Sequence, residues 1–270
     1  MYIYYQWEKG AYSHIASNMI ENDLTHKADD ILSVPDFLDV WEKIWDWNIG
    51  VLPIENSYAG SVHENVYNFL RYDYKIIGEL NMDINHCILS NEKQLSDIKR
   101  VFAHPQALSQ CYNYMKKNNL EPMGFSNNGA AAKMVAESWK SQIAAIAASY
   151  NAELYGLNIL DEWIQDQQWN KTRFFLVASK DTDIEYKEKK DKITILFEAR
   201  NIPASLYKCL GAFATNDINL TKIESIPSLK NPFTYMFWVD FQGKLEDEWV
   251  KNALAELEFF TNDIKVLGEY

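Results

Sequence analysis

The spacing of hydrophobic residues over the first 180 positions predicts short strands that alternate with helices. Apolar runs at residues 2–5 and 49–54 are typical of buried strands. After Pro35, apolar side chains recur every three or four residues over 37–44, which predicts a helix with one face in the core. Because strand-like and helical segments follow one another in this way, we expect an α/β fold for this part of the chain.

The residues after 191 carry a second pattern. Ile193, Ile195, Phe197 and Ala199 fall on one face of a strand, and Pro203 then opens a segment with helical spacing. Further strands are predicted over 219–226, 233–241 and 263–270, with a helix over 250–257. The order βαββαβ is satisfied by a ferredoxin-like arrangement, in which two helices cover one face of a four-stranded antiparallel sheet.

A charged run from Lys180 to Asp191 separates the two patterns. It is nearly free of core residues and has apolar segments on both sides. We therefore predict a domain boundary here, between residues 1–180 and 191–270; a solvated surface loop within one domain is the alternative. A chain of 270 residues is long enough for two such units.

Composition and charge narrow the classes of protein to which the chain could belong. It has 47% hydrophobic residues, enough to fill ordinary cores, and no apolar stretch of the roughly 18 to 20 residues that a membrane span needs. The first residues lack the pattern of a signal peptide, and the three cysteines form no CxxC pair, so we expect a cytoplasmic protein with reduced thiols. A net charge of −12 argues against nonspecific nucleic-acid binding and means that any anion site must supply its own positive potential.

Four loops share a design that suits such an anion site. In each, a strand-like run ends in small, polar or amide residues directly before a helical pattern, at residues 10–14, 55–61, 104–111 and 127–133. A helix N-terminus offers free backbone N–H groups and the positive end of the helix dipole, so several of them around one cleft could hold a multiply charged anion. Taken singly, such residues are more often plain helix caps than ligands.

Other kinds of catalytic site find little support in the sequence. His14, His63, His86 and His104 are not spaced as metal ligands, and neither HExxH nor a paired Cys/His cluster occurs. P-loop, GxGxxG and GxSxG patterns are also missing, so we expect no metal and no cofactor. The run NKTRFFLVAS at 170–179 places an amide, a hydroxyl and a guanidinium before an apolar strand, and is either part of a site or an ordinary strand start.

Taken together, these segments resemble the prephenate dehydratase family. The resemblance rests on YQWEKGAYSH, LPIENSYAGS, AHPQALSQC, NGAAAKMV, YGLNIL with IQD, and NKTRFFLVAS, which occur in the family's order over nearly the whole chain. The segment NIPASLYKCLGAFATNDINLTKIESIP is similar to the ACT regulatory domain that follows the catalytic region in these enzymes. Both likenesses point to an enzyme of phenylalanine biosynthesis.

The resemblance implies an architecture, a reaction and a set of partners. The catalytic region would consist of two subdomains of the type II periplasmic-binding-protein kind, about residues 1–80 plus 166–180 and residues 81–165, with the active site between them. The enzyme would remove carbon dioxide and the ring hydroxyl from prephenate to give phenylpyruvate. Phenylalanine would act as effector through the ACT domain, and the chain would form a homodimer or homotetramer.

The resemblance also carries residue roles onto this sequence. Thr172 would donate to the departing hydroxyl, and Arg173 would bind a substrate carboxylate or else serve a structural pair. The other substrate-binding candidates are Ser13, Asn56, Ser57, Gly60, Ser61, Asn128 and Phe174. The candidates for effector binding are Asn201, Ala204, Ser205, Leu206, Glu224 and Ser225.

The sequence departs from the family pattern at four places. Trp7 replaces a glycine, Asn127-Asn128-Gly129 replaces Asp-Thr-Ala, Ala204-Ser205-Leu206 replaces Gly-Ala-Leu, and Ile226 replaces an arginine. Two further hypotheses therefore stand beside the leading one. The chain could be a binding or sensing protein of the same fold that has lost turnover, or an arogenate dehydratase that acts on the aminated substrate.

Overall fold

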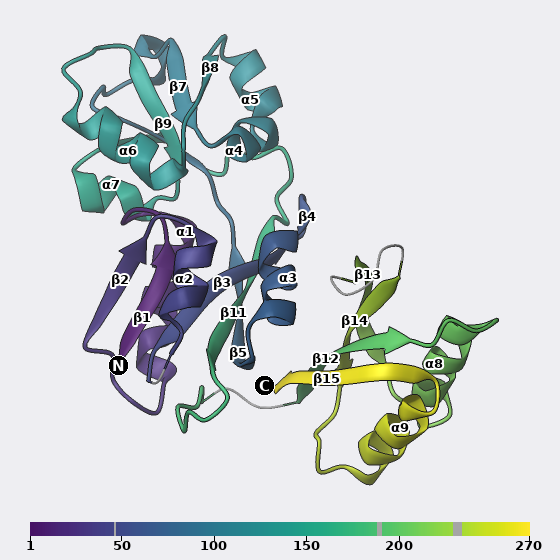
Figure 1. Ribbon diagram of the computed structural model, residues 1–270. Coiled ribbons are helices and arrows are strands. Elements are labelled where there is room, and N and C mark those ends of the chain that lie inside the picture. The colour runs from purple at the N-terminus through teal and green to yellow at the C-terminus, as the bar shows by residue number, and fades with distance from the viewer. Residues whose placement is uncertain (46, 188–190, 229–233) are drawn as a thin grey trace.

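The computed structural model describes residues 1–45, 47–187, 191–228 and 234–270, and it contains three sheets (Figure 1). Two of them form the lobes of an N-terminal α/β region, which we call the first and second lobes. The third forms a separate layer at the end of the chain, which we call the C-terminal domain. The α/β fold class with a ferredoxin-like C-terminal unit is thus confirmed.

The first lobe is a six-stranded mixed sheet with helices packed against it. Its strands are β1 (Tyr2–Gln6), β2 (Asp30–Val34), β3 (Ile49–Asn56), β4 (Gly60–Ser61), β5 (Tyr74–Asp83) and β11 (Lys171–Ser179). Its helices are α1 (Tyr12–Ile20), a 3-10 turn (Glu21–Asp23), α2 (Phe37–Lys43) and α3 (His63–Arg71). The strand order is β2-β1-β3-β11-β5, with β4 paired to β3, so the late strand β11 lies in the middle of the sheet.

The second lobe is a five-stranded sheet of order β10-β6-β9-β7-β8. Its strands are β6 (Cys87–Ser90), β7 (Arg100–Ala103), β8 (Glu121–Gly124), β9 (Ile143–Ala147) and β10 (Asn158–Asp161). Its helical segments are a 3-10 turn (Leu95–Asp97), α4 (Pro105–Gln110), α5 (Tyr112–Lys117), α6 (Asn128–Glu137) and α7 (Tyr150–Tyr155). The chain enters this lobe after β5 and leaves it before β11, and the amide of Ile84 donates to the carbonyl of Asn170 where the two connections meet.

The C-terminal domain has the predicted order βαββαβ. It comprises β12 (Lys192–Ala199), α8 (Ser205–Ala214), β13 (Leu220–Pro227), β14 (Tyr235–Gln242), α9 (Glu248–Glu258) and β15 (Thr261–Glu269). All its strand pairs are antiparallel in the order β13-β14-β12-β15. Phe233, the first residue of one predicted strand, lies outside the described residues.

The two faces of the C-terminal sheet have different partners. Ile193, Ile195 and Phe197 face the helices α8 and α9, as their alternation predicts. On the opposite face, Trp238 stacks on Phe175 of β11 with ring centroids 6.1 Å apart. Consecutive residues of a strand point to opposite faces of the sheet. One face of this sheet therefore forms the core of the C-terminal domain, and the other face forms the contact with the first lobe.

Two predictions about loops are corrected by the structure. Ile184 and Tyr186 of the charged run are buried in the core of the first lobe, and Tyr186 forms a bridge with Leu24, so the run packs as well as links. The loop 55–61 does not lead directly into a helix, because Gly60 and Ser61 turn back as β4 and pair with β3 before α3 begins. No helix in the described part of the chain is both long and apolar enough to cross a membrane.

Candidate active site

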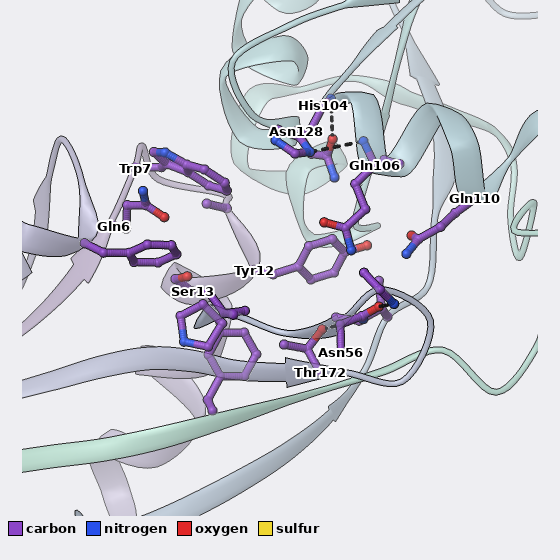
Figure 2. A pocket seen from close by; sticks show the side chains of 18 of the residues that line it. Gln6, Trp7, Tyr12, Ser13, Asn56, His104, Gln106, Gln110, Asn128 and Thr172 are labelled. Atoms are coloured by element: carbon purple, nitrogen blue, oxygen red, sulfur yellow. Dashed lines mark hydrogen bonds between the residues drawn. The ribbon is translucent and has the colours of Figure 1, made fainter. Parts of the chain in front are cut away.

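A cavity of about 450 Å³ lies between the first and second lobes (Figure 2). The polar side chains in its wall include Gln6, Tyr12, Ser13, Asn56, Gln106, Gln110, Asn128 and Thr172. Among the described residues that line it, none is a lysine or an arginine, and Glu64 is the single carboxylate. Any anion bound here must therefore be held by neutral donors and backbone dipoles.

The strand β11 places two predicted site residues in the cavity and turns a third away. Thr172 and Phe174 both line it, whereas the intervening Arg173 points to the other face of the sheet because side chains alternate along a strand. Arg173 donates to Glu79, Asp240 and Tyr270 instead. The prediction of a substrate contact for Arg173 is therefore wrong, and the alternative of a structural pair describes what it does.

The hydroxyl of Thr172 is held by the neighbouring strand. Asn56 Nδ2 lies 2.9 Å from Thr172 Oγ1 and 2.8 Å from Asn170 Oδ1, and Asn56 Oδ1 accepts from the amides of Tyr58 and Ala59. Thr172 Oγ1 thus accepts a hydrogen bond, and within the described chain it donates none to protein. Its proton is free to be donated into the cavity, since a hydroxyl is both donor and acceptor.

A buried chain of polar side chains continues from this point into the second lobe. Asn170 Nδ2 donates to Gln110 Oε1 at 3.1 Å, which also lies 2.8 Å from His86 Nε2. The other ring nitrogen of His86 lies 3.0 Å from the hydroxyl of Tyr12. Gln110 Nε2 is buried and has no hydrogen-bond partner among the described residues, although Gln110 belongs to the cavity wall.

Sequence reasoning missed this chain of side chains. In the sequence, Gln110 is only part of a predicted helix start, and His86 is only a histidine without metal-ligand spacing. Both line the cavity, as does Tyr12, although they are far apart in sequence. The one sequence signal that could have found them is a polar residue at a position surrounded by apolar ones, as in the segment around His86.

Burial lowers the pKa of His86 to about 4, although the hydrogen bond with Gln110 has the opposite effect and raises this pKa. The folded protein therefore keeps His86 neutral where the unfolded chain, with a pKa of 6.5, already binds a proton. Stability from this group is complete above pH 6.5 and is lost as the pH falls toward 4, because the unfolded state then binds more protons. We expect a loss of up to about 3 kcal/mol in the free energy of unfolding over this range.

Urea unfolding from pH 7.5 to pH 4 measures this effect. The variant His86→Gln keeps a polar side chain but cannot titrate, so its free energy of unfolding should fall less steeply with acid than that of the wild type. Equal slopes for the two proteins would contradict the assignment.

Three helix N-termini point their first residues at the cavity. Ser13 lies in the first turn of α1, His104 caps α4, and Asn128 opens α6. Asn128 Oδ1 accepts from the amide of His104 at 2.9 Å, which fixes two of these starts to each other. The dipoles of these helices supply positive potential at the cavity, which compensates for the absence of lysine and arginine among the described residues of its wall.

The two lobes approach closely beside these helix starts. A side chain at Gly129 would place its Cβ 2.7 Å from the backbone nitrogen of Ala11 and 3.0 Å from the carbonyl oxygen of Lys9. Asn127 caps α6 through the amide of Ala130. The Asn-Asn-Gly sequence thus provides a cap, a bridge to His104 and a position without a side chain where the lobes touch.

A sequence model of the family described as "PDT: Prephenate dehydratase" matches residues 3–182. The prephenate dehydratase of Methanocaldococcus jannaschii is 40% identical over 99% of this chain and 97% of its own length. The chain belongs to the prephenate dehydratase family.

Two more relatives extend the comparison with this family. "Arogenate dehydratase/prephenate dehydratase 2, chloroplastic" from Arabidopsis thaliana is 37% identical over 98% of this chain and 71% of its own length. The crystal structure of prephenate dehydratase from Arthrobacter aurescens in complex with L-Phe is 28% identical, with a TM-score of 0.83 over 100% of this chain and 89% of that one. The described fold is therefore that of a prephenate dehydratase along its whole length.

Trp7 adopts a backbone conformation that favours glycine. This is the position at which the family resemblance predicts a glycine. Its φ is +77°, in the left-handed region, and its indole lies 5.7 Å from the ring of His104 across the cleft and 6.3 Å from Phe37. The indole lines the cavity between the lobes, so this prephenate dehydratase family member has a narrower cavity at this point than glycine would leave.

A pair of variants separates the backbone effect at Trp7 from loss of the indole. Trp7→Gly and Trp7→Ala remove the same ring, but only glycine adopts positive φ without strain, so the glycine variant should be more stable by about 1 kcal/mol. The measurement is the free energy of unfolding of each variant in urea. Equal stabilities, or a more stable alanine variant, would show that the left-handed backbone at position 7 is not under strain.

The remaining predicted site residues fall in different places. Gly60 and Ser61 lie in the cavity wall, but the Ser61 hydroxyl donates to Glu224 of the C-terminal domain. Ser57 is not among the residues of the wall, because its side chain donates to the carbonyl of Trp169 and accepts from the amide of Lys171. The prediction of a substrate contact for Ser57 is therefore not supported by the geometry.

The candidates for effector binding form two groups in the C-terminal domain. Asn201, Ala204, Ser205 and Leu206 lie at the start of α8, where Ala204 has a left-handed φ of +58°. Glu224 and Ser225 lie on β13, and the side chain of Glu224 faces the first lobe. No group of acidic, histidine and cysteine side chains suited to a metal ion occurs in the part of the chain described here.

Proposed function

We propose that this chain is a prephenate dehydratase that converts prephenate to phenylpyruvate in the cavity between its lobes. The observation that carries the proposal is the hydroxyl of Thr172, which is oriented by Asn56 and has its proton free toward the cavity. As the ring carboxylate leaves as carbon dioxide, its bonding electrons enter the ring. The same electron flow expels the ring hydroxyl with the C–O bonding pair, and the departing hydroxide, hydrogen-bonded by Thr172, takes up a proton from bulk solvent to become water.

In this proposal, Thr172 supplies a hydrogen bond to the departing oxygen. A threonine is a weak acid, so its contribution comes from oriented hydrogen bonding in a site shielded from water, not from a shifted pKa. Burial raises the pKa of Tyr12 well above its usual value, so this second hydroxyl in the cavity also stays protonated. Aromatisation drives the reaction, and the protein has to hold the substrate and stabilise the leaving group.

The two carboxylates of prephenate would be held by neutral groups. Ser13, Asn128 and the helix starts around them offer hydroxyl, amide and backbone donors, and Gln110 offers an unpaired amide donor. Phe174 supplies an apolar surface for the ring. This arrangement allows a protein of net charge −12 to bind a dianion without a lysine or arginine in the described cavity wall.

The direct test is to incubate the purified protein with prephenate and to follow phenylpyruvate by its absorbance at alkaline pH. Product formation at a rate above that of the uncatalysed reaction is the expected result. Binding of prephenate in a calorimeter without product over hours would instead favour a binding or sensing protein that has lost turnover.

Arogenate is the second candidate substrate, and one feature of the cavity favours it. Glu64 is the single carboxylate among the described residues of the wall, and arogenate carries an ammonium group where prephenate has a keto oxygen. A relative named for both activities aligns with nearly the whole chain. Competition between the two substrates in one assay, read as the ratio of kcat/KM values, decides between them.

We further propose that residues 1–180 form the catalytic region and residues 191–270 an ACT domain that binds phenylalanine. The βαββαβ order, the likeness of residues 201–227 to ACT domains and the relative solved in complex with L-Phe support this division. Titration of phenylalanine in a calorimeter, together with the melting temperature at saturating phenylalanine, tests it. No heat and no stabilisation would leave this domain without an effector role.

We also propose that the protein forms a homodimer or homotetramer in the cytoplasm. Cys87, Cys111 and Cys209 are all free and buried, which fits a reducing compartment. Sedimentation equilibrium measures the state of assembly, and a monomer at micromolar concentration would contradict the first part of the proposal.

A further inference from the structure

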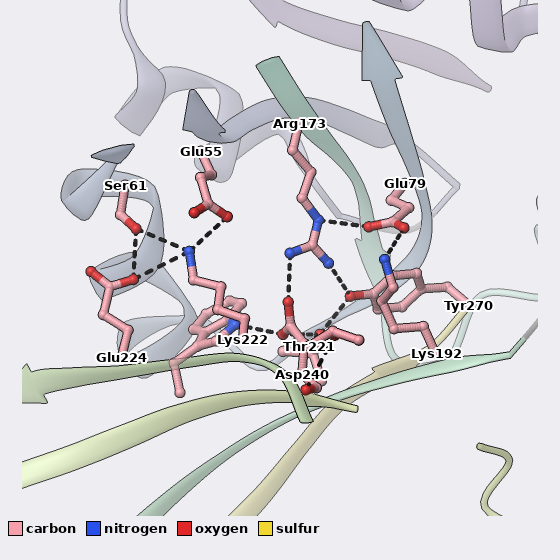
Figure 3. Close-up of polar contacts among 12 residues, drawn as sticks. Glu55, Ser61, Glu79, Arg173, Lys192, Thr221, Lys222, Glu224, Asp240 and Tyr270 are labelled. Carbon is pink, nitrogen blue, oxygen red and sulfur yellow. Dashed lines mark hydrogen bonds and ion pairs between the residues drawn. The ribbon is translucent and has the colours of Figure 1, made fainter. Parts of the chain in front are cut away.

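Two side chains of the C-terminal domain contact Ser61, a residue in the wall of the cavity. Lys222 and Glu224 lie two residues apart on β13, so they point from the same face of this strand toward the first lobe (Figure 3). There they contact Glu55 at the end of β3 and Ser61 on β4. Ser61 is itself one of the residues that line the cavity.

The ammonium group of Lys222 is fully used by these contacts. Its Nζ lies 2.9 Å from Glu55 Oε2, 3.0 Å from Ser61 Oγ and 3.3 Å from Glu224 Oε2, which matches three acceptors to three N–H donors. The Lys222 side chain is 11% exposed and that of Glu224 is 20% exposed. Because both side chains are largely shielded from water, the contact between Lys222 and Glu224 is stronger than an ion pair at the surface, whereas Glu55 is 38% exposed.

The hydroxyl of Ser61 is fixed by the same group. It donates its one proton to Glu224 Oε2 at 2.6 Å and accepts from Lys222. The Ser61 hydroxyl thus both donates to and accepts from side chains of the C-terminal domain. Its one proton is used in the bond to Glu224 and cannot be donated to a substrate.

The hairpin that carries Ser61 leads directly to Thr172. In the β3–β4 pairing, Glu55 lies opposite Ser61 and Asn56 opposite Gly60. Asn56 donates to the hydroxyl of Thr172. Because β4 is only two residues long and pairs with β3 alone, its own hydrogen bonds hold it weakly, and the contact with β13 is the additional restraint on its position.

We propose that Lys222 and Glu224 are positioning residues for the substrate cavity, which act by holding Ser61 and the β3–β4 hairpin in place beside Thr172. The inference rests on the proposed function, because it assigns the C-terminal domain a part in that same site. Lys222 also offsets one of the two negative charges that Glu55 and Glu224 place behind this wall, which lessens their repulsion of a dianionic substrate. A ligand that shifts β13 would act on substrate binding through these contacts.

A double-mutant cycle between Ser61 and Glu224 tests the proposal. Glu224→Gln keeps the size of the side chain but weakens the charged hydrogen bond, and we expect kcat/KM for prephenate to fall about tenfold, mainly through a higher KM. Ser61→Ala should have a similar effect. The double variant should be no worse than either single variant, since both remove the same contact.

Lys222→Met should raise KM further, because it removes the one cation that lies between the carboxylates of Glu55 and Glu224. Lys251→Met is the matched control, since Lys251 also lies in the C-terminal domain but its side chain bonds only to the carbonyl of Glu246 among the described residues. This control should keep the wild-type kcat/KM. Melting temperatures of all variants separate a loss of positioning from a loss of folding, and the near-isosteric Glu224→Gln remains informative if Lys222→Met fails to fold.

The outcomes distinguish this inference from the proposed function. Suppose that the wild-type protein converts prephenate. The positioning role alone would then be overturned by a Glu224→Gln variant with the wild-type kcat/KM. It would also be overturned if the effects of Ser61→Ala and Glu224→Gln on kcat/KM multiplied in the double variant. A wild-type protein that neither binds nor converts prephenate would overturn the proposed function, and this inference with it.

Discussion

Replacement of Thr172 by valine should lower kcat for prephenate by about 10²- to 10⁴-fold, the usual contribution of a placed proton donor. Valine keeps nearly the same shape in the cavity wall and removes the hydroxyl that Asn56 orients. KM should change much less than kcat, because the hydrogen bond to the leaving oxygen strengthens only as charge develops on it. The measurement is the steady-state rate of phenylpyruvate formation at saturating prephenate.

Thr172→Ser is the matched control for this substitution. Serine keeps a hydroxyl at the same position and should retain most of the activity, although without the methyl group its χ1 is less restricted. If Thr172→Val retained the wild-type kcat, or if Thr172→Ser were as impaired as Thr172→Val, the hydroxyl would have no part in the reaction.

Replacement of Arg173 by methionine should lower the free energy of unfolding by about 3 to 5 kcal/mol. The Arg173 side chain is 11% exposed and that of Asp240, which accepts from it, is 1% exposed. Burial alone would lower the pKa of Arg173, but Tyr270, Asp240 and Glu79 around it raise the pKa above its ordinary value, so it stays charged. Methionine fills a similar volume and leaves the buried carboxylate of Asp240 without its cation.

The double variant Arg173→Met with Asp240→Asn is the control for uncompensated charge. It removes both the cation and the buried anion, so it should be more stable than Arg173→Met alone. Urea unfolding of the three proteins measures the difference. A single variant within about 1 kcal/mol of the wild type would show that this cluster contributes as little as a surface ion pair.

The cluster around Arg173 also explains why the two domains meet where they do. Arg173 comes from β11 of the first lobe, whereas Asp240 and Tyr270 come from the C-terminal domain. Lys192, at the start of β12, pairs with Glu79 of β5. Because Arg173 follows Thr172 directly, the strand that presents the hydroxyl to the cavity is anchored on its other face by the C-terminal domain.

The local sequence determined much of the fold. Alternation at Ile193, Ile195 and Phe197 predicted a strand with one face toward helices, and the order of such segments predicted the ferredoxin-like unit. Small and amide residues correctly predicted the helix starts at α1, α4 and α6. These features are readable because strand alternation, helix spacing and caps depend on residues only a few positions apart.

The sequence also named several residues that lie in the cavity wall. Ser13, Asn56, Gly60, Ser61, Asn128, Thr172 and Phe174 are among them. They were found through family likeness and through the residue types that cap helices and end strands. Their roles in the reaction remain predictions that the experiments above test.

Only the tertiary structure decided which way the other side chains point. The direction of Arg173 depends on the register of β11 between β3 and β5, in which Arg173 pairs with Glu55 and Asn81, 118 and 92 positions away in sequence. The contact of Ser61 with Glu224 joins residues 163 positions apart. The sequence by itself determined the local helices and strands and the chemical types of the site residues. Only the long-range pairing of strands determined which side chains meet. The physical reason is that the energies that select a strand register come from packing across the whole fold and not from neighbouring residues.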